Sequence, residues 1–586
     1  MPPSSHTSAA RTRHLTIIAQ DPSVVDRHGR IIRAQAAVPA EDLADGPWGH
    51  RFQVIDFDAS TNALLRPLAA RAYAQAGDGS FPDPFADVDD AAMLASPEFH
   101  AQNVYAIAMR TLSRFEQALG RRVSWGVQSH QIKLVPHAFA DANAFYAPKD
   151  QAIVFGYCPT AIGDGTVFAC LSHDVVAHET THALVDGLRH SFLLPSSPDQ
   201  AAFHEGFADI VAILSVFSLR EVVEGILDSP RAGMGRLNGR VGQRLIDRKQ
   251  ISAAALKRSA LLGLADQMGA ELSGVRGSAL RQSASLKPRK GILDEDEFLE
   301  PHRRGEVLVA AVLNAFVDVW AKRIDSLRQY GSRMNVLRVA EEGCAAADYL
   351  LTMAIRALDY APPVHLGFSD FLSAMLTADY EIRPDDGIYE FRRLLHYHFA
   401  SFGIAPASIG LNAAPGLWTP VDNSALSFER SHFESMQRDP DEMFAFVWEN
   451  RDVLHFFDGA YTKVRSVRPC LRVAPDGFPL RETVAEVSQR IDLSAGELGE
   501  FGIRKPLDMA DATPITLNGG STLVFDEYGR LKYEIHNLVS DAVRQGARIQ
   551  YLWDSAFFED SSDLRRPFAA LHRRRSTSAA ITREGW

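Results

Sequence analysis

The segment from residue 175 to 187, Val-Val-Ala-His-Glu-Thr-Thr-His-Ala-Leu-Val-Asp-Gly, constrains this chain more than any other. It lies in an apolar run that predicts a helix, and it places His178 and His182 four residues apart on one face, with Glu179 beside them. Two neutral imidazoles in this arrangement are typical zinc ligands. The adjacent carboxylate is suited to accept a proton from a water molecule that such an ion activates.

A third ligand is expected from the next helix. A catalytic zinc takes three protein ligands and leaves its fourth position to water. Residues 202 to 214, Ala-Phe-His-Glu-Gly-Phe-Ala-Asp-Ile-Val-Ala-Ile-Leu, predict a helix on which Glu205 and Asp209 lie one turn apart. Glu205 suits the third ligand, and Asp209 suits an outer carboxylate that accepts the ring N–H of a ligating histidine. We interpret His173 and His204 as residues that pack or support the site from outside.

Composition and charge restrict the class of protein. The chain has 586 residues, of which 46% are hydrophobic and 23% charged, which is typical of a globular protein of about three domains. Its formal net charge of -12 argues against nucleic acid as a partner. Four cysteines are too few for a disulfide framework. Cys158 and Cys170 flank one loop, yet we expect them to be reduced.

No targeting segment is predicted. The first residues lack the apolar stretch of a secretory signal, and no apolar run is long enough to span a bilayer. We therefore expect no membrane partner and a cytoplasmic location. Export by a route that needs no such signal stays open.

The pattern of the chain changes twice, which predicts three regions. Residues 1–95 contain short β-type runs and are interpreted as a strand-rich leader similar to a prosegment. Residues 96–408 begin with a capped helix, continue with strands and end with long helical patterns. Residues 409–586 predict a β-rich domain with two hairpins and a basic tail. The predicted fold class is α+β, with the metal-binding helix between a strand-rich half and a helical half.

Roughly residues 95 to 400 resemble the gluzincin metallopeptidases, and among them the thermolysin-like enzymes. These enzymes join His-Glu-x-x-His to a downstream Glu-x-x-x-Asp, as residues 178–182 and 205–209 do here. They also carry an Asn-Ala-Phe-aromatic edge strand before the zinc helix, which residues 143–146, Asn-Ala-Phe-Tyr, match. The resemblance implies a two-lobed catalytic core, with a strand-rich N-terminal lobe, the zinc helix and a helical C-terminal lobe, between β-rich extensions.

Carried over position by position, the resemblance implies a zinc cofactor and a set of site residues. The implied roles are zinc ligation by His178, His182 and Glu205, general-base catalysis by Glu179, orientation of His178 by Asp209, binding of the substrate main chain by Asn143 and Ala144 through strand addition, and an apolar S1′ pocket lined partly by Val175. The implied activity is a zinc-dependent endopeptidase that cuts peptide or protein substrates on the amino side of an apolar residue.

The chain departs from this family where the oxyanion of the reaction must be stabilised. The family uses a tyrosine soon after the zinc helix and a histidine in the helical lobe, but residues 188–194 contain no tyrosine. His302 occupies about the place of the family's histidine and is our candidate catalytic donor. Arg189, His190 and Arg304 remain alternatives. The family's acidic calcium cluster is not matched, so calcium dependence is not implied.

The spacing of the motif residues argues against two other classes of zinc peptidase. A metzincin needs a third histidine six residues after His182, where the chain has Leu188, and the Gly-x-Met-x-Asn strand of the zinc aminopeptidases is not found. Two alternatives stay open. One is a zinc-stabilised peptide-binding or scaffold protein with weak or no catalysis, which the missing tyrosine favours and Glu179 disfavours. The other is a self-processing enzyme whose leader is an inhibitory prosegment.

Overall fold

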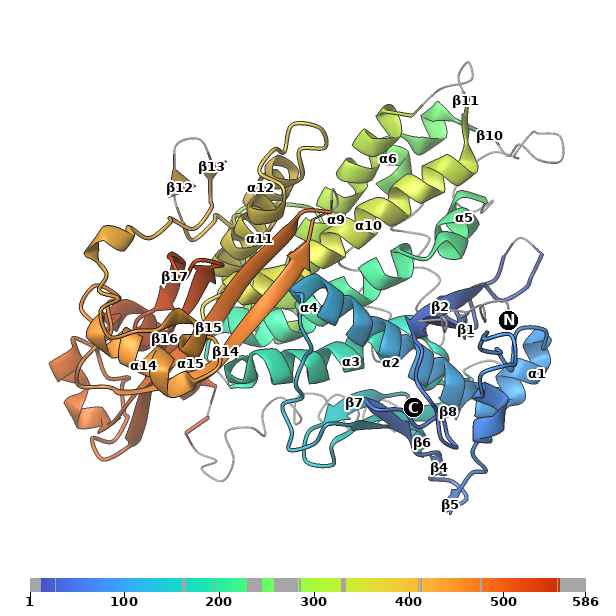
Figure 1. Ribbon diagram of the computed structural model, residues 1–586, viewed down its shortest axis with the longest axis horizontal. Helices are drawn as coiled ribbons and strands as arrows, with labels where there is room; N and C mark the ends of the chain where they lie inside the picture. The colour runs from blue at the N-terminus through green and yellow to red at the C-terminus, as the bar shows by residue number, and fades with distance from the viewer. Residues whose placement is uncertain are drawn as a thin grey trace, which may run out of the picture.

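The protein is a mixed α+β structure with several separate sheets (Figure 1). The computed structural model describes residues 12–26, 28–160, 165–194, 196–228, 245–257, 283, 286–327, 333–408, 410–411, 414–474, 477–555 and 557–558. The predicted basic tail lies outside these residues. In Figure 1 the N-terminal strands lie to the right, the long helices in the middle and the C-terminal sheet to the left.

The elements follow the predicted order, strands first and helices afterwards, before the C-terminal sheet. The α-helices are α1 (Asp90–Ala95), α2 (Pro97–Leu119), α3 (His173–Leu188), α4 (Pro198–Phe217), α5 (Arg220–Asp228), α6 (Ala253–Leu256), α9 (Pro301–Asp325), α10 (Val336–Ala357), α11 (Phe368–Ile382), α12 (Phe391–Ser401), α13 (Phe433–Met436), α14 (Pro440–Glu449) and α15 (Ala542–Asp554). The strands are β1 (Thr12–Ile18), β2 (Arg33–Pro39), β3 (Phe52–Val54), β4 (Phe57–Asp58), β5 (Ala63–Leu64), β6 (Ile132–Phe139), β7 (Ala144–Ala147), β8 (Ala152–Pro159), β9 (Thr166–Phe168), β10 (Leu245–Asp247), β11 (Arg333–Asn335), β12 (Gly410–Leu411), β13 (Ala414–Pro415), β14 (Tyr461–Val473), β15 (Pro479–Ser494), β16 (Pro514–Asp526) and β17 (Leu531–Asn537).

Helix α2 begins and ends where its capping residues predict. The Ser96 side chain accepts the N–H of Phe99, Pro97 takes the first helical position, and Gly120 ends the helix with a φ of 68°. Gly120 is also required by a close approach, because a Cβ there would lie 2.3 Å from the carbonyl oxygen of Leu471. The end of α2 therefore abuts a strand of the C-terminal sheet.

A five-stranded sheet precedes α3, the helix that carries His178 and His182. Its strand order is β3-β6-β8-β7, with β9 paired to β8, and β3, β6 and β8 run parallel while β7 is antiparallel to β8. Strand β7 is thus an edge strand among the described residues, as the sequence predicts. Strand β3 belongs to the leader, and Leu15 and Ile17 of β1 join the same hydrophobic cluster as α2 and α3. The leader therefore shares a core with the middle region.

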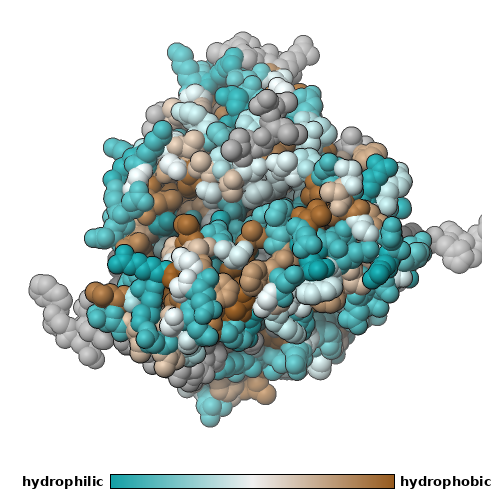
Figure 2. Space-filling model, turned by 90° about the vertical axis from the view of Figure 1, so that its left-hand side faces the viewer, coloured by the Kyte–Doolittle hydropathy of each residue, from teal (hydrophilic) through white to brown (hydrophobic). Residues whose placement is uncertain are grey.

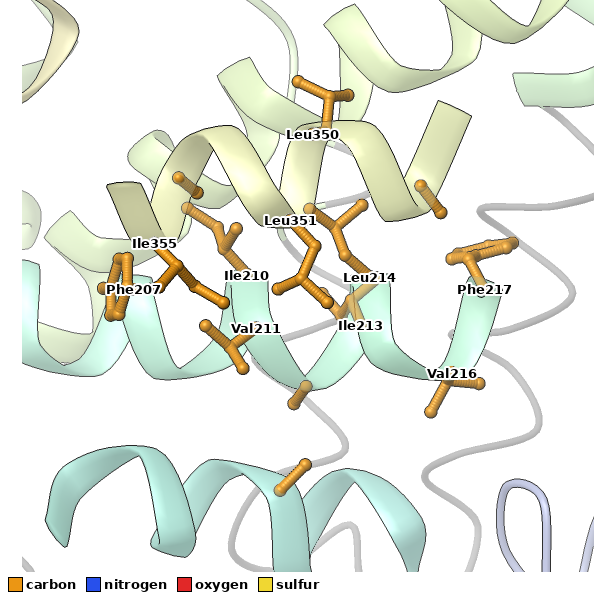
Figure 3. Packing of buried hydrophobic residues seen from close by; sticks show 14 of the residues in the cluster. Phe207, Ile210, Val211, Ile213, Leu214, Val216, Phe217, Leu350, Leu351 and Ile355 are labelled. Atoms are coloured by element: carbon orange, nitrogen blue, oxygen red, sulfur yellow. The ribbon is translucent and has the colours of Figure 1, made fainter. Parts of the chain in front are cut away.

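Helix α4 lies at the centre of the helical half. By length and composition alone, an 18-residue window of this helix could span a membrane, which corrects the expectation that no run is long enough. However, 89% of that window is buried within the protein, as in the core helix of a globular fold. Figure 3 shows Leu351 and Ile355 of α10 pointing toward Ile210, Val211 and Leu214 of α4. Burial on nearly all sides explains why this segment is apolar apart from the face that carries Glu205 and Asp209.

The C-terminal region is built on a four-stranded antiparallel sheet of order β14-β15-β16-β17. Both predicted hairpins, β14 with β15 and β16 with β17, are present. Two smaller hydrophobic clusters lie against this sheet, while Val524, Tyr533 and Ile535 join the main core. Figure 2 shows the end of the molecule that this region forms, with hydrophobic areas set among hydrophilic ones.

A buried ionic network joins this sheet to the helical half. Arg472 of β14 bonds to Asp359, which follows α10, and to Glu482 of β15. Arg121, just after α2, donates to Asp359 Oδ1 at 2.6 Å. Burial alone would raise the pKa of Asp359, but Arg121 and Arg472 outweigh it and hold that pKa well below its usual range. The charged groups therefore bind the two parts together as ions.

Candidate metal centre

The two histidines of α3 and the glutamate of α4 converge on one point. His178, His182 and Glu205 are all buried, and one potential ligand atom from each lies within 4.8 Å of the others. The Nε2 atoms of His178 and His182 lie 3.5 and 3.7 Å from the two carboxylate oxygens of Glu205. Ligands of a tetrahedral zinc, each about 2.0–2.1 Å from the ion, lie about 3.3 Å apart. The three residues therefore fit a single metal ion.

The outer nitrogen of each imidazole is held by a neighbour from α4. Asp209 Oδ1 lies 2.7 Å from His178 Nδ1, which is the contact expected of the outer carboxylate. His204 Nδ1 lies 2.7 Å from His182 Nδ1, and the two rings stack 4.7 Å apart at 24°. Because both Nδ1 atoms are engaged, both Nε2 atoms are directed to Glu205. His204 thus supports the site from outside, as predicted.

Glu179 is fully buried and is anchored to the edge strand. Its Oε2 accepts the backbone N–H of Tyr146 at 3.0 Å. The Tyr146 hydroxyl in turn donates to Asp186 Oδ2 at 2.9 Å, and burial together with the Asp186 charge raises the pKa of Tyr146 well above its usual range. The sequence reasoning named Tyr146 only as part of a strand motif. Its two contacts depend on how β7 lies against α3, which no spacing rule reveals.

The backbone of β7 has groups that face away from the sheet. Asn143 accepts the N–H of Gly156 at its carbonyl, so its peptide group faces β8. In an antiparallel ladder the next residue faces the other way, and the Ala144 N–H indeed donates to Asn143 Oδ1 at 2.9 Å instead of to β8. Ala144 and Tyr146 therefore present their peptide groups to the open edge, on the side where Glu179 lies.

His302 lies beside the three candidate ligands. Its Nε2 is 3.6 Å from Glu205 Oε2, and its Nδ1 is 2.6 Å from Glu300 Oε1. Burial opposes ionisation of Glu300, but hydrogen bonding and charge from His302 lower the pKa of Glu300 to about 2. His302 lies within the first turn of α9, because the Glu300 side chain caps that helix by accepting the N–H of Arg303.

Two of the alternative donors are committed to structural contacts. Arg189 is buried and donates to the carbonyl of Leu358 and to Glu486 of the C-terminal sheet. Arg304 donates to Asp199 Oδ1 at 2.6 Å and to the carbonyl of Leu293 at 2.7 Å. His190 keeps a side chain that is 46% exposed, with Nδ1 2.7 Å from Asp186. Of these four candidates, His302 is the one that the structure places beside Glu205, with its Nε2 3.6 Å from Glu205 Oε2.

Two further predictions concern Val175 and the cysteines. Val175 is 5% exposed and belongs to the main hydrophobic cluster, on the same helix as His178. Its role in a substrate pocket stays a prediction. Cys158, Cys170, Cys344 and Cys470 are all free thiols, which agrees with the expectation of reduced cysteines.

No family model matches the chain, and no curated protein matches it. The class of the protein therefore follows from its fold and its candidate site alone. It is an α+β protein with a buried centre of two histidines and one glutamate that can hold a metal ion.

Proposed function

We propose that the protein is a zinc-dependent metalloendopeptidase that hydrolyses peptide bonds in peptide or protein substrates. The observation that carries the proposal is the position of Glu179, a buried carboxylate next to two candidate ligands and hydrogen-bonded to the edge strand. A centre that only stabilised the fold would have no chemical need for this extra carboxylate. The set of two imidazoles and one carboxylate is one that zinc uses in hydrolytic sites.

The ion supplies Lewis acidity, which polarises the substrate carbonyl and lowers the pKa of water. The chain's own residues supply the rest. Glu179 takes the proton of the attacking water and delivers it to the leaving amine. His302, oriented through Nδ1 by Glu300, donates from Nε2 to the oxyanion. The open edge of β7 at Asn143 and Ala144 binds the substrate main chain as an added strand, and Val175 contributes to an apolar pocket.

Cleavage of casein or of a fluorogenic peptide tests this proposal. The purified full chain is loaded with zinc, treated with a chelator, and then given zinc again. We expect cleavage to be lost on chelation and to return with zinc. Cleavage that survives removal of the ion would contradict a metal-dependent mechanism.

A peptide-binding protein with weak or no catalysis is the second candidate. It is favoured by the absence of a tyrosine from residues 188–194 and by the open edge of β7 beside the centre. This candidate predicts that the zinc-loaded protein binds an extended peptide, as measured by calorimetry, and leaves it intact.

A further inference from the structure

A second group of buried metal-ligating side chains lies outside the centre described above. His100 of α2, His137 of β6 and Cys170, which lies just before α3, have ligand atoms within 4.8 Å of one another. Their exposed fractions are 2%, 4% and 0%. Three elements that are distant in sequence thus bring two imidazoles and one thiol together in the core, and the proposed catalysis uses none of them.

Both outer imidazole nitrogens in this cluster are engaged by acceptors. His100 Nε2 lies 2.9 Å from the carbonyl oxygen of Leu94, and His137 Nδ1 lies 2.6 Å from Asp56 Oδ1. Neither a carbonyl nor a carboxylate has a proton to donate, so each of these ring nitrogens is the donor. A neutral imidazole has only one N–H. The other nitrogen of each neutral ring, the inner one that faces the centre of the cluster, therefore carries a lone pair and no proton.

The two inner nitrogens face each other. His100 Nδ1 and His137 Nε2 are 2.9 Å apart. They can share a proton only if one ring is an imidazolium, a charged form that the burial of both rings disfavours. Two lone pairs that meet inside the protein are a costly arrangement, because each is a buried acceptor without a donor. A cation between them removes this cost.

We propose that His100 Nδ1, His137 Nε2 and Cys170 Sγ form a second metal site for a zinc-type divalent cation. Two imidazoles and a thiolate are donors that such an ion favours. Opening the inner nitrogens from 2.9 Å to the roughly 3.3 Å of a tetrahedral site needs only a small ring rotation. The contacts of His137 with Asp56 and of His100 with Leu94 then act as the outer partners that orient ligating histidines.

The charges at this site balance when the ion is bound. The ion displaces the thiol proton of Cys170, which leaves to solvent, so one thiolate and the Asp56 carboxylate offset the two positive charges. Without an ion, the thiol of Cys170 keeps its proton, because an unpaired thiolate in this fully buried position would be costly. A buried charge is tolerated only when it is paired, and this site provides the pairing.

The position of the site indicates a structural role. The bound ion ties α2 and β6 to the segment that leads directly into α3, the helix of His178. Asn103 of α2 already donates to the carbonyl of Cys170 at 2.9 Å, so these elements are in contact. Both outer partners, Asp56 and Leu94, lie in the leader. The second site does not depend on the proposed peptidase activity.

Cobalt(II) is the probe that separates the two sites, because only a site with a cysteine ligand gives thiolate-to-cobalt charge-transfer absorption. The first centre is disabled by His178→Ala with His182→Ala in the full chain. We expect this variant to bind about one cobalt ion per chain and to show the thiolate band. Adding Cys170→Ser to this variant should abolish both the cobalt binding and the thiolate band. Cys344→Ser, on α10, is the matched control and should leave both unchanged.

The same measurement on the wild-type chain does not depend on whether the variants fold. Circular dichroism checks the folding of each variant. The wild-type chain should show the thiolate band, and Cys170→Ser alone should lose the band while keeping the ion of the first centre. A folded wild-type chain without the band overturns the proposal and favours a proton shared between the two rings. A band that survives Cys170→Ser also overturns it.

Discussion

Two histidines four residues apart can form a metal site here because of the groups that contact the far side of each ring. His178 and His182 are 3% and 0% exposed, and buried polar groups need partners. The Glu-x-x-x-Asp spacing predicted Asp209 as the outer carboxylate of a ligating histidine, and the resemblance to the gluzincin metallopeptidases assigned it to His178. The stacking of His204 on His182 could not be predicted in the same detail, because it depends on how α3 and α4 cross.

Removing Asp209 should weaken metal binding without removing a ligand. In Asp209→Ala, His178 Nδ1 loses its acceptor, so the ring is oriented less firmly and becomes a weaker base. We expect the metal Kd to rise about 10–100-fold while the site still fills at high metal concentration. Competition with a chromophoric chelator measures this. Asp325→Ala, at the exposed end of α9, is the control, and an unchanged Kd in Asp209→Ala would refute the orienting role.

Replacing His302 should slow catalysis and leave metal content unchanged. Loss of an oxyanion donor costs about 10²–10³ in kcat. We therefore expect His302→Ala to lower kcat by that factor, with the metal content of wild type by mass spectrometry. His190→Ala is the comparison, because His190 is 46% exposed and bound to Asp186. If His190→Ala caused the larger loss of kcat, the donor would have to be reassigned to His190.

At the scale of elements, the crossing of α4 and α9 explains why His302 reaches Glu205. Gly206 follows Glu205, Gly305 lies one turn after His302, and a Cβ on Gly206 would lie 2.9 Å from the carbonyl oxygen of Gly305. Two glycines at the contact let the helix backbones approach closely. His302, the proposed catalytic donor, is thus positioned by a helix contact as well as by Glu300.

Gly305→Ala should push these helices apart. A Cβ at this position would lie 3.0 Å from the carbonyl oxygen of Ala202 and 3.1 Å from the Gly206 nitrogen, both rigid backbone atoms. We expect a loss of about 1–3 kcal/mol in the free energy of unfolding, measured by urea denaturation, together with a lower kcat.

Gly546→Ala on α15 is the matched control for that substitution. Its Cβ would meet only Ile503 Cγ2 at 3.8 Å. We expect Gly546→Ala to leave stability unchanged or to raise it by up to about 1 kcal/mol. Equal stabilities for Gly305→Ala and wild type would contradict the close-contact account of α4 and α9.

Local patterns predicted most elements, but not their partners. The helix of His178 and His182 was expected over residues 175–187 and spans His173–Leu188, and the capped helix starts at Pro97 as expected. The parallel pairing of β3 with β6 joins residues about 80 positions apart, from Phe52 with Ile132 to Val54 with Leu134. The meeting of His100, His137 and Cys170 is equally non-local. Such contacts follow from tertiary packing, which periodicity in one segment does not encode.

At the scale of the whole molecule, three predicted regions share buried contacts. The leader contributes β3 to the five-stranded sheet, and β14 bonds to Asp359 of the helical half through Arg472. The domain boundaries at residues 95 and 408 stay predictions, and removal of the leader stays an open alternative. The mass of the purified protein tests that removal. Because the leader shares the core, we expect an intact chain.

Asp359→Asn should loosen the attachment of the C-terminal sheet. The substitution leaves the buried guanidinium groups of Arg121 and Arg472 without the carboxylate that they share. Breaking a buried ion pair by removing one partner costs about 3–5 kcal/mol. We expect a loss of that size in the free energy of unfolding at neutral pH, measured by urea denaturation. Equal stabilities for variant and wild type would rule out this role of the network.

The same network gives the wild type a pH dependence with a defined sign. The pKa of Asp359 lies below its ordinary value of 3.8 in the folded protein. Its contribution to stability is therefore complete above that ordinary value and is lost as the pH falls below it. We expect the stability difference between wild type and Asp359→Asn to shrink in this acidic range. A difference that is constant with pH would contradict the linkage.

The central claim, that Glu179 is the general base of a metallopeptidase, is tested most directly by Glu179→Gln. Metal content and kcat/KM on one fluorogenic peptide are measured for wild type and variant, both loaded with zinc. The account predicts equal metal content and a kcat/KM lower by about 10²–10⁴-fold, because the amide keeps the shape of the side chain but cannot take a proton. Wild-type turnover by Glu179→Gln with its metal bound would contradict the account.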